Sequence, residues 1–422
     1  MYTWLCELAG QLGLNDVGAA DHEWVARQTE GNKRELSRLE GELRGYKNNL
    51  IRESIRMGQE DIATHLLITG GPMLDPTNPQ PPANLGYSAA YQAFGRMRDY
   101  CTTPIHIASM TLRLVYTAFL QAASAQQNHQ PTAIFYSSAL LTAGRLRTVG
   151  VKEEEQVKIT PISCVASGLA HLGQSSYREA AAAFLSTPFE YNTQGPVHGV
   201  DFGKALALAN DLAIYGGLCA LATYSRQELI DLVLGGKFRS FLELEPHMRK
   251  AISLYTTAKY QSCLATLRHY YSDWTLDIFL GARVGAGTHV DNLLARIREK
   301  SIVAYLSSFS EISLSSLAET FPPPNLHLAT SMTAHQAMEY EAESLIQQGT
   351  LAMRLDLVEG TLIAPQKVLR KETHGAARAT AAEVERVLLM RLHKVNIGLG
   401  ALEIGRGKAV WVGGDGSGGG MW

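Results

Sequence analysis

The sequence predicts a mostly α-helical protein, in which an α-solenoid of helical repeats leads into a small α+β module and a C-terminal helix. Three patterns carry this prediction. Apolar residues recur three or four apart through most of residues 87–306, apolar and polar residues alternate over 351–358, and an apolar stripe follows at 384–399. The chain of 422 residues is long enough for two or three domains, and 46% hydrophobic residues suffice for a large packed core.

Residues 1–30 match no pattern that predicts a fold. After them comes an amphipathic helix with a narrow apolar seam, because charged residues fill the gaps between large side chains spaced three and four apart. The seam consists of Leu36, Leu39, Leu43, Tyr46 and Leu50. Packing against the next helix is the favoured interpretation, and an intermolecular coiled coil is the alternative. Residues 70–86 are rich in proline and glycine and predict a loop.

The region from 87 to about 306 alternates helical patterns with short breakers, as stacked antiparallel helix pairs do. Small residues spaced for tight helix pairing of tetratricopeptide type occur within it, although no fixed period can be counted; they are Tyr177, Ala180, Ala181 and Phe184. We expect a helical-repeat arm over 31–205 and further stacked helices over 206–309. The most apolar stretch, 205–224, contains Asn210 and Asp211 and therefore predicts buried helices instead of a membrane span.

Residues 310–370 predict a winged helix. A short amphipathic stretch comes first and contains Ile312, Leu314, Leu317 and Phe321. A longer helical pattern ends at Gly349, the alternating run 351–358 follows, and Glu359-Gly360 turns into a second strand at 361–364. The order of helix, helix and hairpin is that of a winged helix. Its two strands leave an open edge for strand addition by a neighbour, so Arg354, Asp356 and Leu362 are candidate partner-binding residues.

The charges of this region decide between nucleic acid and protein as its partner. A recognition helix for DNA needs lysine or arginine against the phosphates. Residues 334–349 hold Glu339, Glu341 and Glu343 but no lysine or arginine, and the formal net charge of the chain is −2. Nucleic-acid binding is therefore disfavoured, and docking to a protein is the better interpretation.

The segment 371–402 predicts a polar link and a final helix with one apolar side. That side consists of Val384, Leu388, Leu392, Val395 and Leu399. Because the winged helix closes its own core before this point, we expect the stripe to bind a bundle of C-terminal helices from partner subunits. The alternative is that the helix folds back on its own domain. Residues 403–422 are glycine-rich and predict a disordered tail.

Candidate catalytic patterns are weak throughout. None of the 13 histidines forms the His-x-His pair of a metal-dependent isopeptidase, and His327 and His335 stand eight residues apart. We therefore predict no metal site and no cofactor. Gly414, Gly416 and Gly419 match a dinucleotide-binding motif, but no strand or helix surrounds them in this low-complexity tail.

Two further pairs of reactive side chains have simpler explanations. Cys101 and His106 could form a nucleophile and base, but they stand on either side of Pro104, where a packed cysteine and a surface histidine are expected. Glu243 and Glu245 precede a helix, where carboxylates favour the helix dipole. The five cysteines are widely separated, which favours a reducing compartment, and the N-terminus shows no signal peptide.

Several segments resemble the subunit 1 family of the COP-nine signalosome. They are NNLIRESIRMGQEDIATHLL at 48–67, RMRDYCTTPIH at 96–106, LAIYGGLCALATYSRQEL at 212–229, FLELEP at 241–246 and YQSCLATL at 260–267. The resemblance runs from about 30 to about 400 and implies a helical-repeat arm followed by a PCI domain, here 206–370. The chain departs from the family in the longer loop at 70–86 and in Phe321-Pro322-Pro323-Pro324, where the proline run requires an extended link.

The resemblance also implies a function. Members are expected to be non-catalytic scaffolds in a complex that removes a ubiquitin-like modifier from cullins, with the metalloprotease in a different subunit. Partners would be other signalosome subunits, bound through the winged helix and the C-terminal helix, and cullin-RING ligases, reached through the arm. No nucleic acid or membrane is implied, and the location would be cytoplasmic and nuclear. The alternatives are a proteasome-lid scaffold of the same architecture and a nucleic-acid-binding winged-helix protein.

Overall fold

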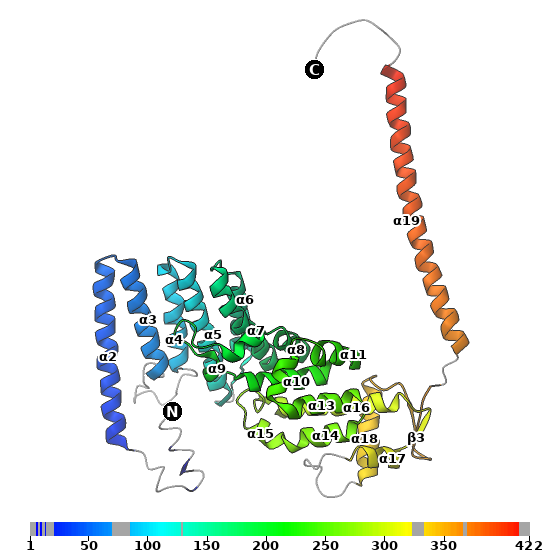
Figure 1. Cartoon of the computed structure of the whole chain (residues 1–422), viewed down its shortest axis with the longest axis horizontal. Helices are drawn as coiled ribbons and strands as arrows, with labels where there is room; N and C mark the ends of the chain where they lie inside the picture. Colours follow the sequence, from blue (N-terminus) through cyan, green and yellow to red (C-terminus); the bar gives the residue numbers. More distant parts are fainter. Residues whose placement is uncertain are drawn as a thin grey trace. The chain divides into compact units, whose positions relative to one another are not determined.

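The computed structural model describes residues 6, 9–10, 13, 21–69, 85–127, 130–322, 333–365 and 369–412. The chain divides into two compact units, residues 1–308 with 320–322, and residues 309–319 with 323–422. The first unit is a stack of helices with one short hairpin, and the second holds a three-stranded sheet and the last helix (Figure 1). The prediction of a mostly α-helical chain of repeats followed by a winged helix is confirmed.

The first unit is built almost entirely from helices that follow one another closely. Its helices are α2 (His22–Asn48), α3 (Arg52–Thr69), α4 (Leu85–Arg96), η1 (Met97–Tyr100), α5 (Pro104–Gln127), α6 (Ala133–Thr148), α7 (Glu153–Gly173), α8 (Tyr177–Leu185), η2 (Phe189–Thr193), α9 (Phe202–Ala205), α10 (Ala209–Thr223), α11 (Arg226–Glu228), η3 (Leu229–Leu234), α12 (Arg239–Leu244), α13 (Pro246–Thr256), α14 (Tyr260–His269), α15 (Tyr271–Thr275) and α16 (His289–Leu306). The hairpin consists of β1 (Arg283–Val284) and β2 (Gly287–Thr288).

Helices α2 to α8 pack in order, each against the next, and we call this series of helices the arm (Figure 1). Leu39 and Leu43 of α2 are buried in a shared core with α3, α4 and α5, so packing within the chain is confirmed for this part of the seam. Leu50 was expected to continue the seam but is 82% exposed, because α2 ends at Asn48. The helix begins at His22, where Asp21 accepts a hydrogen bond from the Trp24 amide. Of the expected loop at 70–86, residues 85–86 begin α4 and the others lie outside the described residues.

Helix α10 occupies the centre of the first unit and contacts α8, α12, α13 and α16. It is buried on every side, as the apolar stretch at 205–224 predicted. Two glycines permit this close packing, since a Cβ at Gly216 would lie 2.6 Å from Phe238 Cζ and one at Gly217 would lie 2.8 Å from Met248 Cε. Lys300 of α16 caps the C-terminal end of α10, because its Nζ donates to the carbonyls of Leu221 and Tyr224.

Substitution of Gly216 by alanine should destabilise the fold, because the added methyl group overlaps the Phe238 ring. We expect a loss of about 1–3 kcal/mol in the free energy of unfolding. The matched control is Gly144→Ala in α6, where an added Cβ meets no atom within 4 Å and helix propensity predicts a gain of up to about 1 kcal/mol. Urea unfolding of both variants measures the difference. Equal effects of the two changes would contradict the packing described here.

A buried histidine makes the stability of the first unit depend on pH. His289 lies at the start of α16, is 1% exposed and shares a 3.0 Å hydrogen bond between its Nδ1 and the Tyr177 hydroxyl. Burial lowers the pKa of His289 from 6.5 to about 4. Above pH 6.5 the histidine is neutral in both states and its contribution is complete. As the pH falls toward 4 the unfolded chain binds the proton first, so stability is lost.

We therefore expect the free energy of unfolding to be lower at pH 5 than at pH 7 by about 2 kcal/mol from His289 alone. Urea titrations of the wild type and of His289→Asn at both pH values isolate this contribution, since the other histidines remain in both chains. The variant should show the smaller loss on acidification. The same pH dependence in both chains would show that His289 is not buried in its neutral form.

Phe321 and Pro322, where the proline run begins, are held against helix α16 of the first unit. The Phe321 side chain is fully buried, with its ring 5.4 Å from that of Tyr305. Arg298 donates from Nη1 to the Pro322 carbonyl at 2.9 Å and from Nη2 to the Phe321 carbonyl at 3.0 Å. The remainder of the predicted insertion, residues 323–332, lies outside the described residues.

The second unit has one strand more and a longer last helix than the sequence predicted. Its elements are β3 (Glu311–Ser313), α17 (Leu314–Thr320), α18 (Ala334–Gln347), β4 (Arg354–Asp356), β5 (Thr361–Ile363) and α19 (Leu369–Val412). Ile312, assigned above to the first helix, instead lies in β3. The expected link at 371–380 is helical, because its alanines favour a helix. The helix also continues beyond 402 to Val412, and the last ten residues of the tail lie outside the described part of the chain.

Candidate protein-interaction site

The winged-helix sheet has the order β3-β5-β4, so β5 is its central strand and β4 is an outer strand. Leu362 of β5 pairs with Ile312 on one side and with Leu355 on the other, and its side chain is fully buried. The sequence placed Leu362 at an open edge, but the third strand, β3, covers that side. Leu362 is therefore a core residue of the sheet, and the outer strand of the predicted hairpin is β4.

The hydrogen bonds at the ends of β3 show which backbone groups of β4 face outward. The Leu314 amide donates to the Gly360 carbonyl at 2.9 Å, and the Ala364 amide donates to the Ser310 carbonyl at 2.8 Å. Because paired residues alternate in an antiparallel ladder, Leu362 directs its N–H and C=O toward β3. Leu355, which lies opposite Leu362, consequently directs its own N–H and C=O away from β5. These two groups are available to a further strand.

The two charged candidates on β4 have different surroundings. Arg354 is exposed, whereas Asp356 is half-buried and closes the turn, since its Oδ1 accepts hydrogen bonds from the amides of Val358 at 2.9 Å and Glu359 at 3.3 Å. The turn itself presents Leu357 and Val358, of which Val358 is 92% exposed. The outer side of the winged helix thus combines an open backbone edge with an apolar tip, which suits contact with a protein.

The two helices of the winged helix, α17 and α18, contain no lysine or arginine. Helix α18 begins with a capping box between Thr333 and Gln336, and Met338, Ala342 and Leu345 are its buried residues. Glu343 is exposed, Glu339 and Glu341 are half-buried, and α18 contains no lysine or arginine. A helix of this composition would repel a nucleic-acid backbone.

Helix α19 presents apolar side chains to solvent between residues 384 and 402. The predicted stripe of Val384, Leu388, Leu392, Val395 and Leu399 is between 52% and 58% exposed. Further apolar residues stand beside it and were missed in the sequence; they are Val387, Leu389, Met390, Ile397 and Leu402. The consecutive run at 387–390 was the signal for them, because four apolar residues in a row cover all sides of a helix, and such helices are normally buried.

The comparisons with known proteins agree with this architecture. Residues 21–71 and 85–232 match the family described as 26S proteasome subunit RPN7, and residues 264–366 match the PCI domain. The chain is 39% identical over 388 residues to COP9 signalosome complex subunit 1 of Emericella nidulans, an alignment that covers 91% of this chain and 69% of the relative. The chain belongs to the COP9 signalosome complex subunit 1 family.

Other members of the COP9 signalosome subunit 1 family are similar over nearly the same length. The protein of Neurospora crassa is 31% identical over 386 residues, covering 91% of this chain and 76% of the relative. Subunit 1b of Drosophila melanogaster is 31% identical over 372 residues, and this chain spans 62% of its length. The family resemblance inferred from the sequence motifs is thereby confirmed.

The candidate catalytic residues of the sequence have individual surroundings in this member of the signalosome family. Burial raises the pKa of the Cys101 thiol, which disfavours the thiolate, and His106 lies 3.9 Å from Glu53. Glu245 accepts from Asn210 at 2.7 Å and lies 3.1 Å from His247, whereas Glu243 lies near Arg239. The two glutamates therefore have separate structural partners.

A metal site, a dinucleotide-binding glycine motif and a membrane span were also considered from the sequence. Within the described part of the chain, no group of three or more histidine, cysteine or acidic side chains is placed to hold a metal ion. His335 lies in α18, while His327 and the glycine motif at 414–419 fall outside the described residues. No described helix combines the length and the apolar character needed to cross a membrane.

Proposed function

We propose that this chain is a non-catalytic scaffold subunit of a COP9 signalosome complex. In that role it supports the removal of a ubiquitin-like modifier from cullins by a metalloprotease in another subunit, and so the regulation of cullin-RING ubiquitin ligases. The observation that carries the proposal is the 39% identity over 388 residues to COP9 signalosome complex subunit 1 of Emericella nidulans. The place of action would be the cytoplasm and the nucleus.

Two exposed surfaces support a scaffolding role. The outward N–H and C=O of Leu355, beside Arg354, offer an edge for a strand of a neighbouring subunit. Helix α19 offers apolar side chains that the described part of this chain does not cover. We propose that β4 contacts a second winged helix and that α19 joins a bundle of helices from partner subunits. The arm would then be the part that reaches cullin-RING ligases.

A proteasome-lid scaffold is the second candidate, because residues 21–71 and 85–232 match the family described as 26S proteasome subunit RPN7. Purification of the tagged chain from its native cells, followed by mass spectrometry, distinguishes the two. Recovery of signalosome subunits in stoichiometric amounts is expected. Recovery of proteasome-lid subunits would reject the proposal. Recovery of nucleic acid whose binding weakens steeply as the salt concentration rises would favour a DNA-binding winged helix.

The isolated chain should bind no stoichiometric zinc and should cleave no modifier from cullins. The reason is that its sequence lacks the paired histidines and acidic residues of a metal-dependent isopeptidase. Metal analysis after dialysis and a cleavage assay on a modified cullin test this expectation. One equivalent of zinc together with cleavage that a chelator abolishes would show the chain to be an enzyme.

A further inference from the structure

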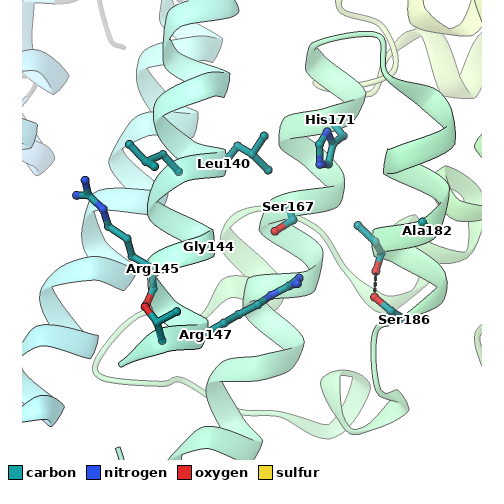
Figure 2. A pocket seen from close by; sticks show the side chains of 11 residues that line it. Leu140, Gly144, Arg145, Arg147, Ser167, His171, Ala182 and Ser186 are labelled. Carbon is teal, nitrogen blue, oxygen red and sulfur yellow. Dashed lines mark hydrogen bonds between the residues drawn. The ribbon is translucent and has the colours of Figure 1, made fainter. Parts of the chain in front are cut away.

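A groove of about 690 Å³ crosses helices α6, α7 and α8 of the arm. Figure 2 shows α7 between the other two helices, with Ser167 and His171 facing the groove, Leu140 and Gly144 on α6, and Ala182 and Ser186 on α8. The lining includes Arg145, Arg147 and His171 but no acidic residue. In Figure 2 the Arg145 side chain extends to the side of α6 away from α7, and burial lowers the pKa of His171, which favours its neutral form. Arg147 is therefore the cation that makes the groove complementary to an anion.

Arg147 is held in place by contacts across the groove. Its Nε donates to Ser163 Oγ at 3.0 Å and its Nη2 lies 3.6 Å from Cys164 Sγ, and Ser163 in turn donates to the Ala143 carbonyl at 2.8 Å. In Figure 2 its side chain extends from α6 toward α7. These contacts leave Nη1 to donate to a ligand. A guanidinium that is already fixed loses little entropy on binding a carboxylate, which is the anion that its planar geometry suits.

Gly144 supplies an independent indication of a ligand. It is exposed in the middle of α6, where glycine destabilises a helix relative to alanine. An added Cβ would meet no atom within 4 Å, so packing does not require glycine here, in contrast to Gly216. The absence of a side chain keeps the groove open to the close approach of another backbone. Ala182 and Ala183 on the facing helix are similarly short.

We propose that this groove binds an extended acidic segment of a partner protein. One carboxylate of the segment would accept a hydrogen bond from Arg147, and its backbone would lie over Gly144, with apolar side chains against Leu140 and Leu141. A second hollow, at the N-terminal end of α7, is lined by Glu153 and Glu190 and by no basic residue. Acidic side chains of the bound segment are therefore favoured only next to Arg147.

Fluorescence anisotropy with the isolated full-length chain tests the proposal, with the labelled peptide Glu-Glu-Ala-Leu-Ala-Leu, which is acidic at one end and apolar at the other, as the probe. We expect saturable binding that Arg147→Glu and Gly144→Trp weaken about tenfold or more. Arg44→Glu is the matched control and should bind as the wild type does, because Arg44 is an exposed arginine of α2. Gly144→Ala should weaken binding less than Gly144→Trp does, because one methyl group intrudes less on a backbone that lies over Gly144. Labelled hexalysine should not bind.

Wild-type affinity in both Arg147→Glu and Gly144→Trp would overturn the proposal. Equal weakening by Arg44→Glu would overturn it too, since that result indicates a general charge effect. Displacement of the peptide by sulfate at the same concentration would assign the site to small anions instead. Arg147→Glu loses its contact with Ser163 and can melt at a lower temperature, in which case Gly144→Trp decides. Assembly plays no part in this measurement, so its failure is separate from failure of the scaffold role.

Discussion

Replacement of Leu388 and Leu392 by aspartate should remove the chain from its complex while leaving the isolated chain as stable as before. Both leucines are exposed, at 53% and 58%, so their loss should change the free energy of unfolding by less than about 0.5 kcal/mol. In a helix bundle each buried leucine contributes roughly 1.5–3 kcal/mol. The double change should therefore weaken association by a factor of about 10² to 10⁴.

Co-purification with partner subunits and a thermal melt of the isolated chain are the two measurements. Ala379→Asp is the control, because it introduces an aspartate into α19 on the side opposite the stripe and ahead of the apolar run. This control should remain in the complex. A lower melting temperature of the isolated leucine variant would show instead that α19 packs on its own chain.

Replacement of Leu355 by proline should abolish strand addition at β4 while the winged helix stays folded. The N–H of Leu355 faces away from β5, so proline removes no hydrogen bond within the sheet, and edge strands accept proline in this position. Leu362→Pro should instead unfold the winged helix, at a cost of about 3 kcal/mol or more, because Leu362 is buried and its N–H faces β3.

Circular dichroism and co-purification of the two proline variants distinguish these roles. Leu355→Val keeps the N–H and controls for the altered side chain. We expect Leu355→Pro to melt with a normal transition and to lose its neighbour, and Leu355→Val to retain both properties. Undiminished assembly of Leu355→Pro would exclude the β4 edge from the interface.

Local patterns in the sequence were sufficient for the repeats, the winged helix and the apolar stripe. The apolar stretch at 205–224 and the spacing from Val384 to Leu399 each describe one helix, and a helix displays its own pattern in the sequence. Strand β3 was missed because three residues are too few for a visible alternation, and its pairing with β5 joins residues that are 48 to 52 positions apart in the sequence. The outward direction of Leu355 depends on that pairing and could not be inferred without it.

The groove could not be predicted from the sequence. Gly144 and Arg147 are ordinary residues of a helical pattern, and their relation to Ser167 and Ser186 exists only once three helices are stacked. The end of α19 was also missed. Its alanine-rich first turns and its later glycines give contrary signals, and the helix nevertheless extends over 44 residues.

The exposure of α19 has a consequence for the amount of this chain that a cell can maintain. At 44 residues the helix is about 66 Å long, and its uncovered leucines resemble the surfaces by which chaperones and proteases recognise incomplete proteins. A copy made in excess of its partners would keep this surface open and would be degraded or would aggregate. We expect the abundance of the chain to follow the supply of its partners more closely than its own rate of synthesis.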